Sequence, residues 1–213
     1  MKTNELIDML TTNVEPVKGR RVWVALTVAL LISGAASFCL MMMTVGLRSS
    51  APGGFHVGLL IFKLLFSVSL VIIGGAALNK LHRPGQEIRR LFKIVFVPFF
   101  IVGLAGAISL ALKPSAVWDQ MVMGTAWAAC LFCIPLFAII PFIGLVWVMR
   151  REAPTNLTRT GAIAGLVAGA VGAAIYAFHC PDDSLPFIAI WYGIMIALCA
   201  WIGAKLGPRF LRW

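Results

Sequence analysis

The chain has 213 residues, of which 61% are hydrophobic and 12% are charged. Soluble domains are about 45–50% apolar and about 25% charged, so this composition excludes a soluble protein and predicts an integral membrane protein. The net charge of +10 does not indicate nucleic-acid binding, because the basic residues lie at the ends of apolar runs and form no patch with interleaved aromatic residues.

Residues 1–21 form a polar tail with an amphipathic helical pattern. Four apolar residues share one face of the predicted helix and two acidic residues suit its N-terminal end: Leu6, Ile7, Leu10 and Val14, with Glu5 and Asp8. A helix of about three turns is marginal alone in water, so its apolar face needs a cover. That cover is either the bilayer surface or another molecule, and the acids on the polar face argue against anionic lipid.

Six membrane spans follow the tail, each close to the roughly 20 apolar residues that cross a bilayer. They are predicted over residues 22–47, 57–81, 91–112, 123–149, 160–178 and 185–206. Lys63, near the start of the second span, is expected to snorkel to the interface. The predicted fold is therefore an all-α membrane protein with a tail over 1–21, a six-helix domain over 22–206 and a short tail over 207–213.

The basic residues predict the orientation of these spans. They gather at one set of span ends, at positions 2–21, 80–93, 150–159 and 205–212, whereas the opposite loops hold only Arg48 and Lys113. By the positive-inside rule the basic side is the cytoplasm, so both termini are predicted inside. The loops 48–56, 113–121 and 179–184 then face outward.

Small residues mark one face of the fifth span. Gly161, Gly165 and Gly169 recur every four residues, which lets a neighbouring helix approach closely. We expect ordinary tight packing there, with a sliding helix as the functional alternative. The fourth and fifth spans are predicted to form an antiparallel hairpin around residues 150–159.

The outward turn after the fifth span gathers His179, Cys180, Asp182 and Asp183. Cys130, near the outer end of the fourth span, shares the depth and side of Cys180. The two thiols are able to meet if these spans are neighbours, and the outer compartment of a bacterial cell permits a disulfide. The thiols, the imidazole and the carboxylates equally suit a soft or borderline metal ion. The simpler interpretation is that the polar residues only cap and end helices.

The other cysteines point less clearly to chemistry. Cys133 lies one turn deeper than Cys130, while Cys39 and Cys199 lie inside spans and are expected to be packing residues. No nucleophile–base constellation is recognisable, so no enzyme is predicted. The alternatives are a membrane thiol-disulfide oxidoreductase, which would need an exposed C-x-x-C loop, and a small transporter, which would need ionisable groups deep in the spans.

Three stretches together resemble the NrsF family, the negative regulators of sigma-F. They are Thr3-Asn4-Glu5-Leu6-Ile7-Asp8, Cys130-Leu131-Phe132-Cys133-Ile134-Pro135-Leu136 and Tyr176-Ala177-Phe178-His179-Cys180-Pro181-Asp182-Asp183-Ser184. The resemblance implies a six-span anti-sigma factor of the bacterial inner membrane. In that family the N-terminal segment holds an extracytoplasmic-function sigma factor, and two outward-facing cysteines release it on sensing heavy metal or oxidant.

Carried onto this chain, the resemblance implies that Cys130 and Cys180 are the sensor pair, with Cys133 as the alternative to Cys130. The implied sigma-binding residues are those of the tail: Glu5, Leu6, Ile7, Asp8, Leu10 and Val14. No cofactor is required, and a heavy-metal ion would be a transient signal. The expected partners are a sigma factor and the lipid bilayer, without direct contact to nucleic acid.

Overall fold

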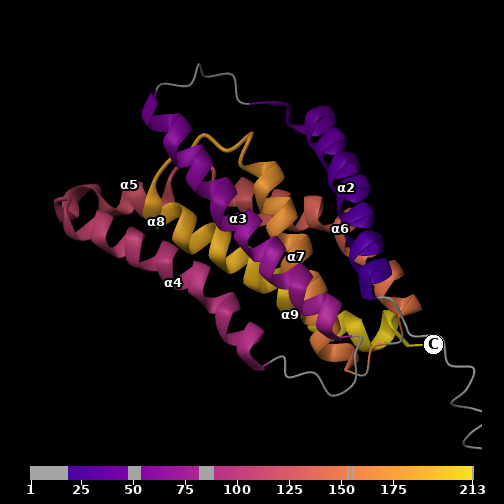
Figure 1. Ribbon diagram of the computed structural model, residues 1–213. Helices are drawn as coiled ribbons and strands as arrows, with labels where there is room; N and C mark the ends of the chain where they lie inside the picture. The colour runs from indigo at the N-terminus through magenta and orange to yellow at the C-terminus, as the bar shows by residue number, and fades with distance from the viewer. Residues whose placement is uncertain (1–18, 48–53, 82–88, 153, 155, 213) are drawn as a thin grey trace, which may run out of the picture.

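The structure is a computed structural model that describes residues 19–47, 54–81, 89–152, 154 and 156–212. Every regular element among these residues is a helix, and no strand occurs in them (Figure 1). The predicted amphipathic helix of the tail, with all six of its implied sigma-binding residues, lies outside the described residues.

Six helical segments of the described chain are long and apolar enough to cross a membrane, which agrees with the six predicted spans. The elements are α2 (Gly19–Thr44), α3 (Gly54–Leu81), α4 (Arg89–Ala111), η1 (Ser115–Val117), α5 (Trp118–Met123), α6 (Trp127–Arg151), α7 (Leu157–Tyr176), α8 (Leu185–Phe187), the π-helical turn η2 (Ile188–Tyr192) and α9 (Gly193–Phe210).

Two boundaries differ from the predicted ones by four residues, and the others differ by three or fewer. The chain turns at Gly124, so the fourth span begins as α6 at Trp127 and is preceded by the separate short helix α5. At the other end, α9 continues to Phe210, which makes most of the predicted tail over 207–213 helical.

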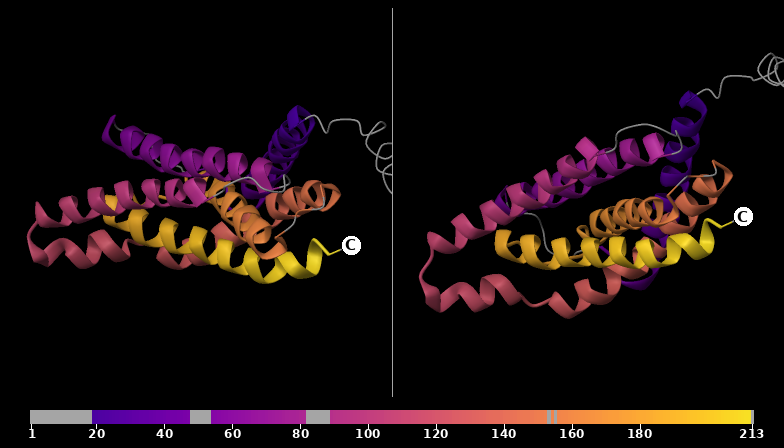
Figure 2. Two further views of the ribbon diagram at one scale, coloured as in Figure 1. Left: turned by 60° about the horizontal axis from the view of Figure 1, so that its bottom comes forward. Right: turned by 90° about the horizontal axis from the view of Figure 1, so that it is seen from below.

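α7 is the central helix of the bundle. Of its apolar span 72% is buried inside the protein, against 22–44% for the other five. It contacts α9, α6, α3 and α2, and lies between α3 and α9 in the two views of Figure 2. A helix so enclosed needs little side-chain volume, which explains why glycine and alanine dominate its sequence.

The small-residue face of α7 packs against α9. A Cβ on Gly161 would collide with the carbonyl oxygen of Gly203, and a Cβ on Gly203 with that of Gly161. The expected tight packing of the fifth span is thus confirmed. Another face of α7 contacts α6, where a Cβ on Gly172 would come within 2.6 Å of the Ile134 carbonyl oxygen. α6 and α7 are therefore neighbours, as the predicted hairpin requires.

A proline and a serine fix α2 against α6. Pro141 has no N–H to donate to the Phe137 carbonyl four residues earlier, which would leave that carbonyl unpaired inside the bundle. The buried hydroxyl of Ser37 on α2 donates to this oxygen instead, at 3.0 Å.

The helix ends form two distinct ends of the bundle. The first residues of α2 and the last residues of α9 lie at one end, and the turn after α7 lies toward the other (Figure 1). This turn, residues 177–184, is here called the α7–α8 turn.

Candidate functional site

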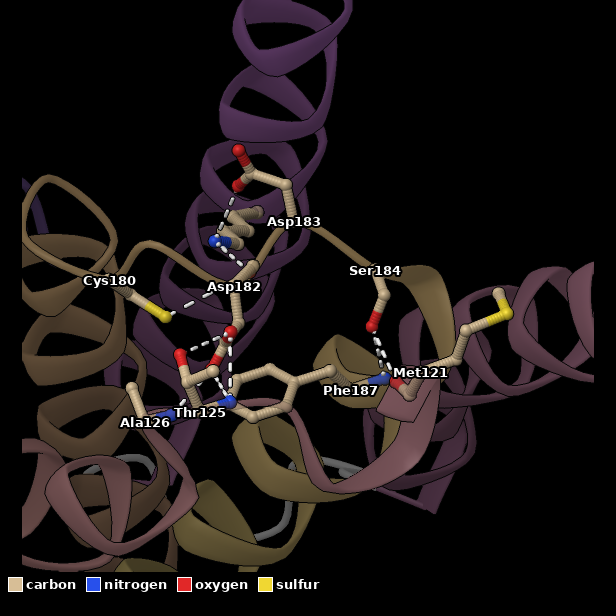
Figure 3. A network of polar contacts seen from close by, with 9 residues as sticks. Met121, Thr125, Ala126, Cys180, Asp182, Asp183, Ser184 and Phe187 are labelled. Atoms are coloured by element: carbon tan, nitrogen blue, oxygen red, sulfur yellow. Dashed lines mark hydrogen bonds and ion pairs between the residues drawn. The ribbon is translucent and has the colours of Figure 1, made fainter. Parts of the chain in front are cut away.

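The polar side chains of the α7–α8 turn reach toward several different helices (Figure 3). α7 ends at Tyr176, and Pro181 is unable to continue it because it lacks a backbone donor. The chain therefore crosses to α8 as an irregular segment whose polar groups need partners outside the turn. Those partners come from α3, α5, the residues just after α2 and the residues just before α6.

Cys180 of this turn contacts Cys130 in the first turn of α6. Both side chains are fully buried free thiols, and Cys130 is the largest influence on the pKa of the Cys180 thiol beside it. The structure thus brings together the two cysteines that were predicted to lie at the same depth and on the same side of the membrane. The other cysteine of α6, Cys133, lies about one turn further along the helix and is half-buried.

The environment of Cys180 favours its thiolate. The hydrogen bond from Cys130 lowers the pKa of Cys180, and the nearby Lys63 ammonium lowers this pKa further, against the opposing effect of burial. The thiolate is the form that attacks oxidants and binds metals, so this lowered pKa favours reaction at Cys180.

Lys63 of α3 was expected to snorkel to the membrane surface, and this prediction is wrong. Its side chain is fully buried. The ammonium forms an ion pair with the Asp183 carboxylate at 2.9 Å and donates to the Asp182 carbonyl oxygen at 2.7 Å. A lone lysine within an apolar span was the available signal, because an ionisable group inside a membrane protein normally has a buried partner.

Asp182 caps α6 from a distant part of the chain. Its carboxylate accepts from the backbone N–H of Ala126 at 2.7 Å, and from the backbone N–H and the hydroxyl of Thr125, each at 2.9 Å. These N–H groups precede the first turn of a helix, where intrahelical partners are missing and negative charge is favourable. Gly124, at φ +58°, has no Cβ to obstruct the carboxylate.

Ser184 and His179 attach the turn at two further points. Ser184 caps α8 by accepting from the Phe187 N–H, and its hydroxyl donates to the Met121 carbonyl oxygen at 2.6 Å. His179 places Nδ1 3.0 Å from the carbonyl oxygen of Gly46, just beyond α2. The capping interpretation of the turn is thus right for Asp182 and Ser184, although Asp182 caps a helix far along the chain.

These attachments decide which groups remain for a metal ion. Among the residues that the structure describes, no three His, Cys, Asp or Glu side chains gather in one site. His179 and both carboxylates face partners of their own, so they do not surround Cys180 as ligands. A thiophilic ion bound here would be held by the two sulfurs of Cys130 and Cys180.

Two tyrosines that sequence reasoning had not singled out enclose the thiol pair. Tyr176 and Tyr192 are fully buried, and their ring centroids are 6.4 Å apart. Tyr176 interacts with Cys130 and Tyr192 with Cys180, while neither hydroxyl has a hydrogen bond of ordinary geometry in the described structure. Tyr192 ends the π-helical turn, a type of distortion frequent at functional sites.

The family model and two curated relatives that match this chain all belong to the same family. The family model described as NrsF, negative regulator of sigma F, matches residues 10–213. The chain is 27% identical over 213 residues to the probable anti-sigma-F factor NrsF of Azospira oryzae, and 28% identical over 222 residues to the anti-sigma-F factor NrsF of Caulobacter vibrioides. Both alignments cover 100% of this chain and of the relative.

No solved structure matches the chain. The family match covers nearly the whole sequence, and the resemblance drawn from three short stretches is confirmed. The chain belongs to the NrsF family of negative regulators of sigma F, whose members are regulators rather than enzymes.

Proposed function

We propose that this protein is an anti-sigma factor of the bacterial inner membrane that holds an extracytoplasmic-function sigma factor through its N-terminal segment. It releases the sigma factor when Cys130 and Cys180 react with a heavy metal or an oxidant. The observation that carries the proposal is the contact between two buried free thiols in a turn that is also bonded to α2 and α3.

The N-terminal segment supplies the binding element. Its apolar residues Leu6, Ile7 and Leu10 fall on one side of a helical pattern that is too short to be stable alone, so docking on a partner would bury that side. Both relatives are named as anti-sigma-F factors, so a sigma factor is the expected partner. The segment is covalently joined to α2, which begins at Gly19.

The thiol pair supplies the sensor. A two-electron oxidant would join the two sulfurs in a disulfide, taking up two electrons as the two thiols lose their protons. A thiophilic ion would instead bridge two thiolates. Switching from mostly bound to mostly released requires about 5.5 kcal/mol of differential binding, and a metal–thiolate site binds with about 10 kcal/mol or more.

The α7–α8 turn offers a route from sensor to segment. A disulfide requires an S–S distance of about 2 Å, so the sulfurs of two free thiols must move closer when they react. His179 precedes Cys180 in the chain and is bonded to Gly46 at the end of α2. Displacement of the turn would therefore reach the helix that carries the N-terminal segment.

Burial of the pair does not suit the alternative of a thiol-disulfide oxidoreductase. Such an enzyme exposes its reactive cysteine to a substrate protein, whereas Cys130 and Cys180 are both 0% exposed. A small ion or oxidant is the kind of signal that fits an enclosed site.

A reporter driven by the sigma-dependent promoter tests the proposal in cells. Cys130→Ser and Cys180→Ser should each retain repression but lose induction by the thiol oxidant diamide or by Hg²⁺, because one thiol cannot form a two-sulfur bridge. Cys199→Ser is the matched control, since Cys199 packs against Gly169 in the α7–α9 contact, and it should respond normally. Leu6→Glu should give constitutive expression at a normal level of membrane protein.

The two parts of the proposal fail separately. Full induction in the Cys130→Ser, Cys180→Ser double variant would show that the signal does not enter through the thiols. Continued repression by the Leu6→Glu variant would show that the N-terminal segment is not the binding element.

A further inference from the structure

Lys63 is buried within a membrane span, which is unfavourable for a charged side chain. α3 begins at Gly54, so Lys63 lies about 13 Å along the helix at a rise of about 1.5 Å per residue. Its side chain is 0% exposed, although a charged group is costly to remove from water. An ionisable residue buried within a membrane span is by default a candidate for a functional role.

The two bonds of Lys63 converge on the residues that follow the sensor cysteine. The ammonium donates to the Asp182 carbonyl oxygen at 2.7 Å and pairs with the Asp183 carboxylate at 2.9 Å. The sulfur of Cys180 lies 3.9 Å from the same Asp182 carbonyl oxygen. Lys63 and Cys180 therefore share one backbone oxygen.

The α7–α8 turn is held from two sides at this point. Lys63 binds it to α3 through the Asp182 carbonyl and the Asp183 carboxylate, while the Asp182 carboxylate binds it to the start of α6. His179 and Ser184 attach the turn at two further points, so the bonds to α3 and to the start of α6 act on its middle, at Asp182 and Asp183. Together they fix the backbone two residues after Cys180, and with it the place of the sulfur over Cys130.

We propose that Lys63 is a positioning residue of the sensor, which holds the α7–α8 turn so that the Cys180 sulfur meets the Cys130 sulfur. This inference rests on the proposed function for its biological meaning. Its physical content concerns the thiol pair itself, so it is measurable without any signalling readout.

Disulfide equilibrium with glutathione tests this role in the full-length protein in membranes. In Lys63→Met both bonds are lost, and the equilibrium constant for the Cys130–Cys180 disulfide should fall by about tenfold or more, because a small misplacement of two reacting groups has effects of that size. Lys63→Arg keeps a cation with several donors and should recover most of the loss. Lys80→Met is the matched control, since Lys80 is exposed near the other end of α3, and it should behave as the wild type.

A second variant separates positioning from folding. Lys63→Met leaves Asp183 as a buried charge without its ammonium, whereas the Lys63→Met, Asp183→Ala double variant removes both charges together. The double variant should therefore accumulate in the membrane and still show the weakened disulfide.

A double variant that forms the disulfide as readily as the wild type would overturn the positioning role. That result is distinct from failure of the proposed function, which would appear as normal induction in cells that carry the Cys→Ser variants.

Discussion

At the scale of single residues, the α7–α8 turn depends on a glycine that lies outside it. Gly124 has φ +58°, and a Cβ there would come within 2.6 Å of the Asp182 carboxylate and 2.9 Å of the Phe187 ring. The position therefore excludes side chains for two reasons, its backbone conformation and the approach of the carboxylate that caps α6.

Gly124→Ala should lower stability by about 2–4 kcal/mol, of which about 1–3 kcal/mol is the strain of a backbone at φ +58° and ψ −160°, a region nearly restricted to glycine, and the rest is the displaced cap. Gly46→Ala is the control, because Gly46 has φ +70° but open space around its Cβ position, so it reports the backbone strain alone. The midpoint of thermal unfolding in detergent measures both. Equal shifts for the two variants would contradict a contribution from the Asp182 contact.

The residue scale also shows what the sequence could predict of the site. The positions of Cys130 and Cys180 within their spans determined their depth and side, so their proximity was predictable. The role of Lys63 was not, because its acid partner lies 120 residues further along the chain and no local pattern connects the two. A lysine near a span end looks the same in sequence whether it reaches water or a buried carboxylate.

At the scale of elements, hydropathy predicted the helices well because a membrane requires a nearly constant apolar length. It missed the break between α5 and α6, since the apolar run continues from Met121 through the break. What ends one helix and starts the next there is the turn at Gly124 and the cap from Asp182, which belongs to another part of the chain.

The close contact between α7 and α9 should be sensitive to an added side chain. Gly203→Ala should destabilise the protein by about 1–3 kcal/mol or more, because its Cβ would meet the backbone of Gly161 and Gly165 rather than a side chain able to move away. Gly103→Ala on α4 is the matched control. Gly103 has open space at its Cβ position, so alanine there should be neutral or stabilise the helix by up to about 1 kcal/mol.

Thermal unfolding of the two variants in the same detergent decides whether close helix approach is essential. A neutral Gly203→Ala variant would mean that α7 and α9 are able to separate at little cost. The sliding-helix alternative for the fifth span would then be favoured over tight packing.

At the scale of the whole molecule, the fold separates the two functions proposed for it. α2, which follows the N-terminal segment, begins at the same end of the bundle at which α9 ends, and the α7–α8 turn lies toward the opposite end. The exposed basic residues Arg21, Lys80, Arg150 and Lys205 belong to helix ends on the side where α9 finishes. The positive-inside rule predicts that this side faces the cytoplasm, where a sigma factor is found.

A phosphatase that is active only outside the cytoplasm should therefore be silent when fused after Trp213 and active when fused after Lys113, in the loop at the opposite end. Equal protein levels of the two fusions provide the control. The reverse result would place the α7–α8 turn in the cytoplasm, where glutathione and thioredoxin keep thiols reduced. A stable Cys130–Cys180 disulfide would then not persist, and metal binding by the two sulfurs would be the remaining way for this pair to respond to a signal.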